Sequence, residues 1–147
     1  MVDCIALVVA GGRGARFGGE LPKQYRRLAA RTILRHSVEA FYRHPRVGGV
    51  RVVIHPDDRR HYDEAVHGLD LLAPCFGGKE RQDSARLGLE SLADLKPARV
   101  LIHDAARPLV DAGTIDRVIA ALDDAPGAIA AIPVTDTLKR WEDGRIS

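Results

Sequence analysis

Residues 8–23 read VVAGGRGARFGGELPK, a run of β-branched residues that leads into a glycine-rich, cationic segment. Glycines let the backbone take positive φ angles and let bare N–H groups approach an anion closely. Arg13, Arg16 and Lys23 add positive charge to the same segment. The stretch therefore predicts a strand followed by a loop that holds the phosphates of a nucleotide.

Two better-known glycine motifs do not fit this loop. The dinucleotide-binding fingerprint requires a glycine where this chain has Phe17. A P-loop requires Ser or Thr after Gly78-Lys79, where Glu80 stands, and a leading glycine, where Ala73 stands. Pro22 removes a backbone donor and blocks helix continuation, so the sequence predicts a long, extended loop that closes over its ligand.

The composition is that of an ordinary globular domain. With 147 residues, 46% hydrophobic and 29% charged, the chain is expected to form a single domain. Its net charge of +2 gives no reason to expect nucleic acid as a partner. The first apolar run is too short to cross a membrane and follows Asp3, so neither a membrane segment nor a signal peptide is predicted. Cys4 and Cys75 lack Cys-x-x-Cys spacing, which favours a reducing, cytoplasmic location.

Apolar runs of strand length alternate with amphipathic stretches. The apolar runs, which predict strands, lie at residues 5–9, 50–54, 100–102 and 128–134. A weaker strand is predicted near residues 71–76, and residues 137–141, followed by Asp143-Gly144, predict one hairpin arm whose returning strand is essentially missing. The expected fold is α/β, a Rossmann-like three-layer sandwich with a mostly parallel sheet. The expected buried helix faces are Leu34/Val38/Phe41/Tyr42, Ala85/Leu89/Leu92 and Ile115/Val118/Ile119/Leu122.

Three blocks in order carry a family resemblance: Gly12-x-Gly14-x-Arg16 followed by PKQY at 22–25, HDAARP at 103–108 and DTLKR at 136–140. Together they resemble the 2-C-methyl-D-erythritol 4-phosphate cytidylyltransferases, over nearly the whole chain. Residues 55–58 and 115–119 also resemble the amino-terminal part of bifunctional versions fused to a cyclodiphosphate synthase. The resemblance implies one domain of nucleotidyltransferase type over residues 1–147, truncated on the C-terminal side and incomplete after the hairpin arm near 137–147.

The resemblance also implies a reaction. The phosphate of 2-C-methyl-D-erythritol 4-phosphate attacks the α-phosphorus of CTP, which gives 4-diphosphocytidyl-2-C-methyl-D-erythritol and pyrophosphate in the non-mevalonate isoprenoid pathway. A phosphate monoester has its second pKa near ~6 and is already largely anionic, so a general base adds little. Positioning and charge neutralisation are what this reaction needs from the protein. Arg16 and Lys23 match the family's catalytic cations. For Arg13, a role at the phosphates and a position in solvent are equally consistent with the sequence.

Nucleotide-binding residues follow from the same resemblance: Ala10, Gly11, Gly12, Gly14, Gly77, Gly78, Ser84 and Asp104. Asp104 ends a predicted strand, where a carboxylate suits Mg²⁺ as well as the capping of a turn. The resemblance favours the magnesium role. Arg107 is expected to orient Asp104 or to reach a phosphate, and Thr137 matches a threonine that contacts the substrate.

Other functions stay open at this point. The nearest is a different polyol- or sugar-phosphate nucleotidyltransferase, which only base and acceptor specificity would separate from the first. Another class is a nucleotide-binding or dimerising fragment without turnover. The resemblance implies CTP and a small phosphorylated polyol as ligands, with a homodimer as the assembly.

Overall fold

The computed structural model describes residues 3–12 and 21–146. Its main sheet has four parallel strands in the order β5-β4-β1-β6, formed by β1 (Cys4–Val9), β4 (Gly49–Ile54), β5 (Cys75–Phe76) and β6 (Arg99–Asp104). The helices are α1 (Ile33–Tyr42), α2 (Arg59–Ala65), α3 (Arg81–Glu90) and α4 (Ala112–Ala121). Smaller elements are the 3-10 turns η2 (Lys23–Tyr25), η3 (Pro56–Asp58) and η4 (Ala93–Leu95), and the strand pairs β2 (Arg27–Leu28) with β3 (Arg31–Thr32) and β7 (Trp141–Glu142) with β8 (Arg145–Ile146).

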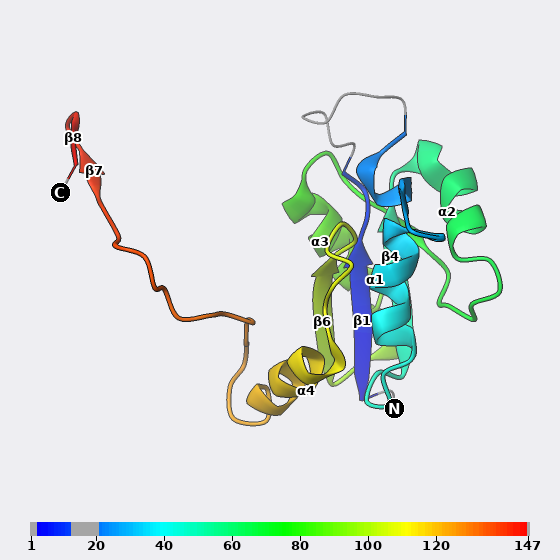
Figure 1. Ribbon diagram of the computed structural model, residues 1–147. Helices are drawn as coiled ribbons and strands as arrows, with labels where there is room; N and C mark the ends of the chain where they lie inside the picture. The colour runs from blue at the N-terminus through cyan, green and yellow to red at the C-terminus, as the bar shows by residue number, and fades with distance from the viewer. Residues whose placement is uncertain (1–2, 13–20, 147) are drawn as a thin grey trace.

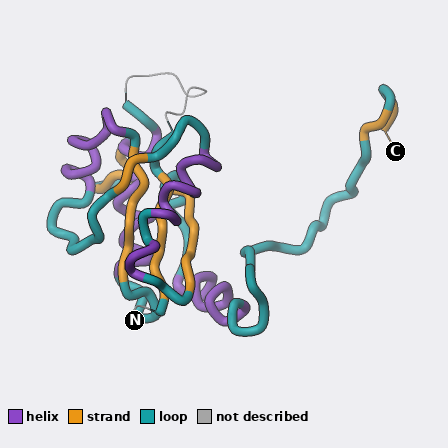
Figure 2. The backbone as a smooth tube through the Cα atoms, turned by 180° about the vertical axis from the view of Figure 1, so that it is seen from behind, coloured by secondary structure: helices purple, strands orange, loops and turns teal. Residues whose placement is uncertain are grey.

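Side chains of β1 alternate between two buried layers, as a strand covered on both faces requires. Ala6 and Val8 lie in an apolar cluster with α1 and α4. Ile5 and Leu7 lie in a second cluster, on the face that α3 covers. Figure 1 shows α1 in front of the sheet, and Figure 2, seen from behind, shows α3 in front. The predicted three-layer α/β fold is therefore confirmed.

Helix α3 packs on the sheet through small residues. Its buried residues are Ser84 and Gly88, whereas Leu89 is 41% exposed. A Cβ atom on Gly88 would lie 2.7 Å from Leu7 Cδ2 and 2.8 Å from Val53 Cγ2. The predicted face of Ala85, Leu89 and Leu92 is therefore wrong for Leu89, because the close approach of the helix is made possible by glycine. Of the other predicted face residues, Tyr42 is exposed on α1, while Ile115 and Ile119 are buried on α4.

Replacing Gly88 by alanine should lower the free energy of unfolding by about 1–3 kcal/mol, because the added methyl group overpacks two buried side chains. Urea unfolding measures the change. Gly113→Ala in α4 is the matched control, since its added methyl group meets only the far end of Arg117 and the Asp111 carboxylate, at 3.3 and 3.4 Å. Equal stability of the two variants would contradict the close packing of α3.

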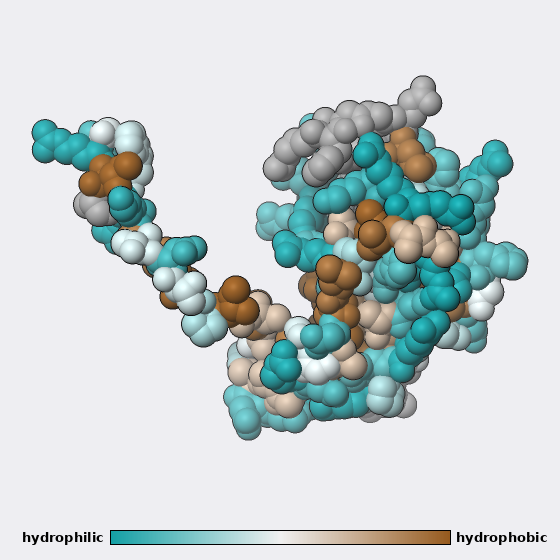
Figure 3. Space-filling model, in the orientation of Figure 1, coloured by the Kyte–Doolittle hydropathy of each residue, from teal (hydrophilic) through white to brown (hydrophobic). Residues whose placement is uncertain are grey.

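The tail after α4 differs from the sequence prediction. Residues 128–134 form no strand, and Ile129 and Ile132 are each 88% exposed. Apolar composition predicts a strand here, but within the described residues no neighbouring strand pairs with this segment. Figures 1 and 3 show the tail leading away from the sheet, with apolar side chains along it.

The hairpin itself is present but shorter than predicted. Its first arm begins at Trp141 rather than at Thr137, and Arg145–Ile146 form the returning strand that the sequence prediction left out. Asp143 and Gly144 both have positive φ angles, 47° and 77°, which suits a tight two-residue turn. The turn prediction is therefore confirmed, whereas the arm boundaries are corrected.

No helix within residues 3–12 and 21–146 has the length and apolar character that crossing a bilayer requires.

Candidate active site

A cavity of about 590 Å³ opens at the carboxyl ends of β1 and β6. Four segments line it, contributing Val9 to Gly12, Lys23 and Gln24, Gly78 to Arg81 with Ser84, and Asp104 to Arg107. The chain runs outward from β1 to β4 and β5 and then returns to β6 on the other side of β1. Loops diverge at such a reversal of strand order, and α/β sheets bind ligands there.

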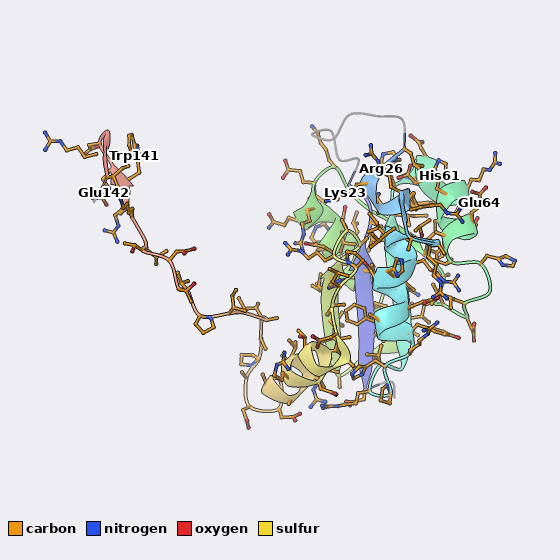
Figure 4. The ribbon with its side chains drawn as sticks, viewed as in Figure 1. Lys23, Arg26, His61, Glu64, Trp141 and Glu142 are labelled. Carbon is orange, nitrogen blue, oxygen red and sulfur yellow. The ribbon has the colours of Figure 1, made fainter. Side chains whose placement is uncertain are left out.

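The cavity brings together most of the predicted site residues, namely Ala10, Gly11, Gly12, Lys23, Gly78, Ser84, Asp104 and Arg107. Gly77 lies directly beside this lining. Gly14, Arg13 and Arg16 lie outside the described residues. Thr137 is not at the cavity, because it stands on the tail between α4 and β7. Figure 4 shows Lys23 near the carboxyl end of β1, whereas Trp141 lies at the far end of the tail.

The first glycine segment, Ala10 to Gly12, and the second, Gly77 and Gly78, both approach Ser84. A Cβ atom would lie 3.2 Å from Ser84 Oγ at Gly11 and 2.5 Å from it at Gly77, so the absence of side chains allows this contact. Ser84 is buried, and its hydroxyl accepts a hydrogen bond of 3.1 Å from the Gly78 N–H. Ser84 therefore organises the backbone of the second glycine segment beside the first.

Asp104 is held between two arginines. Arg81 Nη2 lies 2.7 Å from Asp104 Oδ1, and Arg107 Nε lies 3.1 Å from Oδ2. Burial on its own would raise the pKa of this carboxyl, but hydrogen bonds and charges from Arg81 and Arg107 outweigh it and hold the pKa below its usual value. Asp104 is thus ionised at neutral pH, and it gathers two guanidinium groups at the cavity.

Asp104 fits only one kind of magnesium site. Within residues 3–12 and 21–146, no group of three or more His, Cys, Asp or Glu side chains could hold a metal ion. Mg²⁺ keeps several waters and commonly takes one or two carboxylates together with substrate phosphates. A lone carboxylate that already pairs with two arginines fits a Mg²⁺ that arrives with nucleotide phosphates, and it does not fit a metal held by the protein alone.

His103 supports the loop after β6. Its Nε2–H donates to the carbonyl oxygen of Arg107 over 2.9 Å, and its ring packs on Phe41 with centroids 4.9 Å apart. Burial lowers the pKa of the His103 ring below its usual value. A neutral ring can still donate this hydrogen bond, so burial leaves the contact of His103 with the loop intact.

Among the cavity residues that the sequence prediction left out, Arg81 and Gln24 make side-chain hydrogen bonds to other parts of the lining. Arg81 has no role in the sequence prediction, but it pairs with Asp104, 23 positions away in the sequence. Gln24 stood in a quoted motif without a role, but its side chain is buried and bonded to the glycine segment. The available signal was position, because Arg81 lies three residues before Ser84 and Gln24 directly follows Lys23.

Comparisons with known proteins agree with this geometry. The family model described as 2-C-methyl-D-erythritol 4-phosphate cytidylyltransferase, IspD, matches residues 4–147. The bifunctional enzyme IspD/IspF of Paramagnetospirillum magneticum is 60% identical over 147 residues, which is 100% of this chain and 38% of the relative. A 2-C-methyl-D-erythritol 4-phosphate cytidylyltransferase of Cereibacter sphaeroides is 49% identical over 143 residues, which is 96% of this chain and 63% of the relative.

Among solved structures, a 4-diphosphocytidyl-2C-methyl-D-erythritol synthase matches with a TM-score of 0.80 and 32% identity, over 100% of this chain and 67% of that one. The chain spans 38% of the length of the bifunctional relatives from P. magneticum and Rhodospirillum rubrum. Because the family model covers nearly every residue and the fold agrees, the chain belongs to the 2-C-methyl-D-erythritol 4-phosphate cytidylyltransferase family.

Proposed function

We propose that this chain carries the cytidylyltransferase activity of its family. The phosphate of 2-C-methyl-D-erythritol 4-phosphate attacks the α-phosphorus of CTP, the bond to the β-phosphate oxygen breaks, and pyrophosphate leaves. The observation that carries the proposal is the cavity itself, where glycine backbone meets Lys23, Arg81 and Arg107 at the reversal of strand order. Backbone donors and cations are what two reacting polyanions require.

The proposed division of labour follows the chemistry of each group. Ala10, Gly11, Gly12 and Gly14, with Gly77, Gly78 and Ser84, hold the nucleotide through backbone and hydroxyl groups. Arg16 and Lys23 neutralise charge at the α-phosphate as the new bond forms. Arg107 and Thr137 contact the acceptor. Family membership supports the assignment for Gly14, Arg16, Gly77 and Thr137. Cavity placement supports it for the others, which are Ala10, Gly11, Gly12, Lys23, Gly78, Ser84 and Arg107.

Magnesium is the proposed cofactor. When bound with CTP it neutralises phosphate charge, with Asp104 as a ligand directly or through water. The placement of the Asp104 carboxylate in the cavity lining, beside the glycine backbone and Lys23, supports this role. CTP binding by the protein is therefore expected to depend on the Mg²⁺ concentration.

A homodimer in the cytoplasm is the proposed assembly and location. Exposed apolar residues on the tail, including Leu138, Trp141 and Ile146, support an assembly in which a second copy covers them. Thr137 stands on the same tail, so a partner that orders the tail would also place this residue. Cys4 and Cys75 are both free thiols, which supports a reducing compartment. Residues 1–147 are proposed to act as one nucleotidyltransferase domain.

Calorimetry tests the nucleotide half of the proposal. CTP with Mg²⁺ should bind the chain at least about tenfold more tightly than UTP or ATP with Mg²⁺, because readout of the base by hydrogen bonds discriminates strongly. CTP binding should weaken when Mg²⁺ is removed. Equal affinity for all three nucleotides would favour a different nucleotidyltransferase, and binding of none would leave no basis for the activity.

A further inference from the structure

We propose that Gln24 is a positioning residue that fixes the first glycine segment relative to Lys23; this inference rests on the proposed function. The Gln24 side chain amide donates to two carbonyl oxygens, 2.7 Å to Ala10 and 3.1 Å to Gly12. Gln24 is only 5% exposed, and Ala10 is also buried. One side chain thus bonds both ends of the segment from Ala10 to Gly12.

The bond to Ala10 orients the amide that follows it. In a trans peptide, the carbonyl of one residue and the N–H of the next point in opposite directions. The described chain contains no cis peptide, so the Ala10 carbonyl that faces Gln24 turns the Gly11 N–H away from it. The Ala10 N–H is already bonded to Val53 O over 2.7 Å, whereas the Gly11 N–H donates to no backbone oxygen in residues 3–12 and 21–146. Gly11 therefore presents an oriented donor beside the cavity.

The same residue fixes Lys23. Gln24 and Tyr25 are the buried residues of η2, and backbone hydrogen bonds from Tyr25 N to Pro22 O and from Arg26 N to Lys23 O close this turn. Lys23 is the immediate neighbour of Gln24 and lines the cavity. The distance between the Lys23 backbone and the Gly11 amide is thus set through Gln24. Both groups are proposed to meet one triphosphate, so a change in their separation weakens that contact.

The alternative is a purely structural role, in which Gln24 only satisfies buried carbonyl groups and stabilises the fold. The two roles differ in what they predict for ligands. A structural role changes stability and affects all ligands alike, whereas a positioning role affects the phosphates of the nucleotide more than its nucleoside. CTP and CMP share the nucleoside and the α-phosphate, so their affinities separate the two roles.

Gln24→Met keeps the length of the side chain but removes the donor, and Gln24→Glu places an acceptor against two carbonyl oxygens. Calorimetry with Mg²⁺ should show CTP affinity about tenfold lower in Gln24→Met and lower again in Gln24→Glu, with a smaller loss for CMP. Hydrogen–deuterium exchange without nucleotide should be faster at residues 10–12 and unchanged in β4. Gln82→Met, at an exposed glutamine outside the cavity lining, is the matched control and should change neither result.

Each outcome decides between the possibilities. Normal CTP affinity in Gln24→Met would overturn the inference while leaving the proposed function intact. Equal losses for CTP and CMP, together with lower stability in urea, would overturn it in favour of a structural role. Absence of CTP binding in the unaltered chain would overturn the proposed function itself, and the role of Gln24 in positioning would fall with it.

Discussion

Replacing Lys23 by methionine should lower kcat for pyrophosphate release about 10²–10³-fold while leaving the fold intact. Lys23 lines the cavity. Its backbone is held in η2, in which the two following residues, Gln24 and Tyr25, are buried. Loss of a preorganised group that stabilises charge in the transition state has effects of this size. Methionine keeps most of the aliphatic length, so packing changes little. Steady-state kinetics with saturating CTP, Mg²⁺ and 2-C-methyl-D-erythritol 4-phosphate measure the effect on kcat.

Lys96→Met is the matched control for this substitution. Lys96 is exposed and follows η4, before the amino end of β6, at the opposite end of the sheet from the cavity. The control removes the same charge from the same protein, so it should retain full turnover. A Lys23→Met protein that is as active as the control would remove Lys23 from the proposed chemistry.

Replacing Asp104 by asparagine should lower the effect of Mg²⁺ on CTP binding. The ratio of CTP affinity with Mg²⁺ to CTP affinity without it should fall about tenfold. Asparagine keeps the shape but removes the negative charge that draws a metal and that balances Arg81 and Arg107. A tenfold change in affinity corresponds to about 1.4 kcal/mol, and a hydrogen bond to a charged group contributes about 1.5–3 kcal/mol, so the loss of one such interaction accounts for the change. Without Mg²⁺, CTP should bind the variant at least as well as it binds the unaltered chain, because two guanidinium groups lose their internal partner.

Calorimetric titrations of CTP at several Mg²⁺ concentrations give this ratio directly. Asp94→Asn changes an exposed aspartate of η4 in the same way and should leave the ratio unaltered. If the Asp104→Asn protein showed the Mg²⁺ dependence of the unaltered chain, Asp104 would act only through its contacts with the two arginines. The magnesium proposal for this residue would then be wrong.

The central sheet was predictable because the local sequence of its longer strands is apolar. Residues 5–9 are continuously apolar and residues 50–54 are apolar except for Arg51, which is typical of strands buried on both faces, and both form strands as expected. Residues 128–134 have the same local character but lack a partner in the described structure. Strand formation depends on pairing as well as composition, and pairing is a long-range property.

Helix α3 and the cavity show the same limit. Apolar periodicity selected Leu89 for the core, while the residue that allows close packing is Gly88, which has no side chain to advertise it. Glycine motifs and strand ends were sufficient to predict which segments form the cavity. The contacts of Gln24 with Ala10 and of Arg81 with Asp104 join residues 14 and 23 positions apart, and only the folded chain brings them together. The roles of all the predicted site residues stay predictions, including those of Lys23 and Asp104, which line the cavity.

Acceptor-dependent release of pyrophosphate is the most direct measurement of the proposed activity. The chain would be incubated with CTP and Mg²⁺, alone and with 2-C-methyl-D-erythritol 4-phosphate, and in parallel with another polyol phosphate such as ribitol 5-phosphate. The proposed function predicts rapid release only with 2-C-methyl-D-erythritol 4-phosphate, together with formation of its cytidine diphosphate derivative. Preferential release with the other polyol phosphate, or CTP binding with no release under any condition, would contradict it.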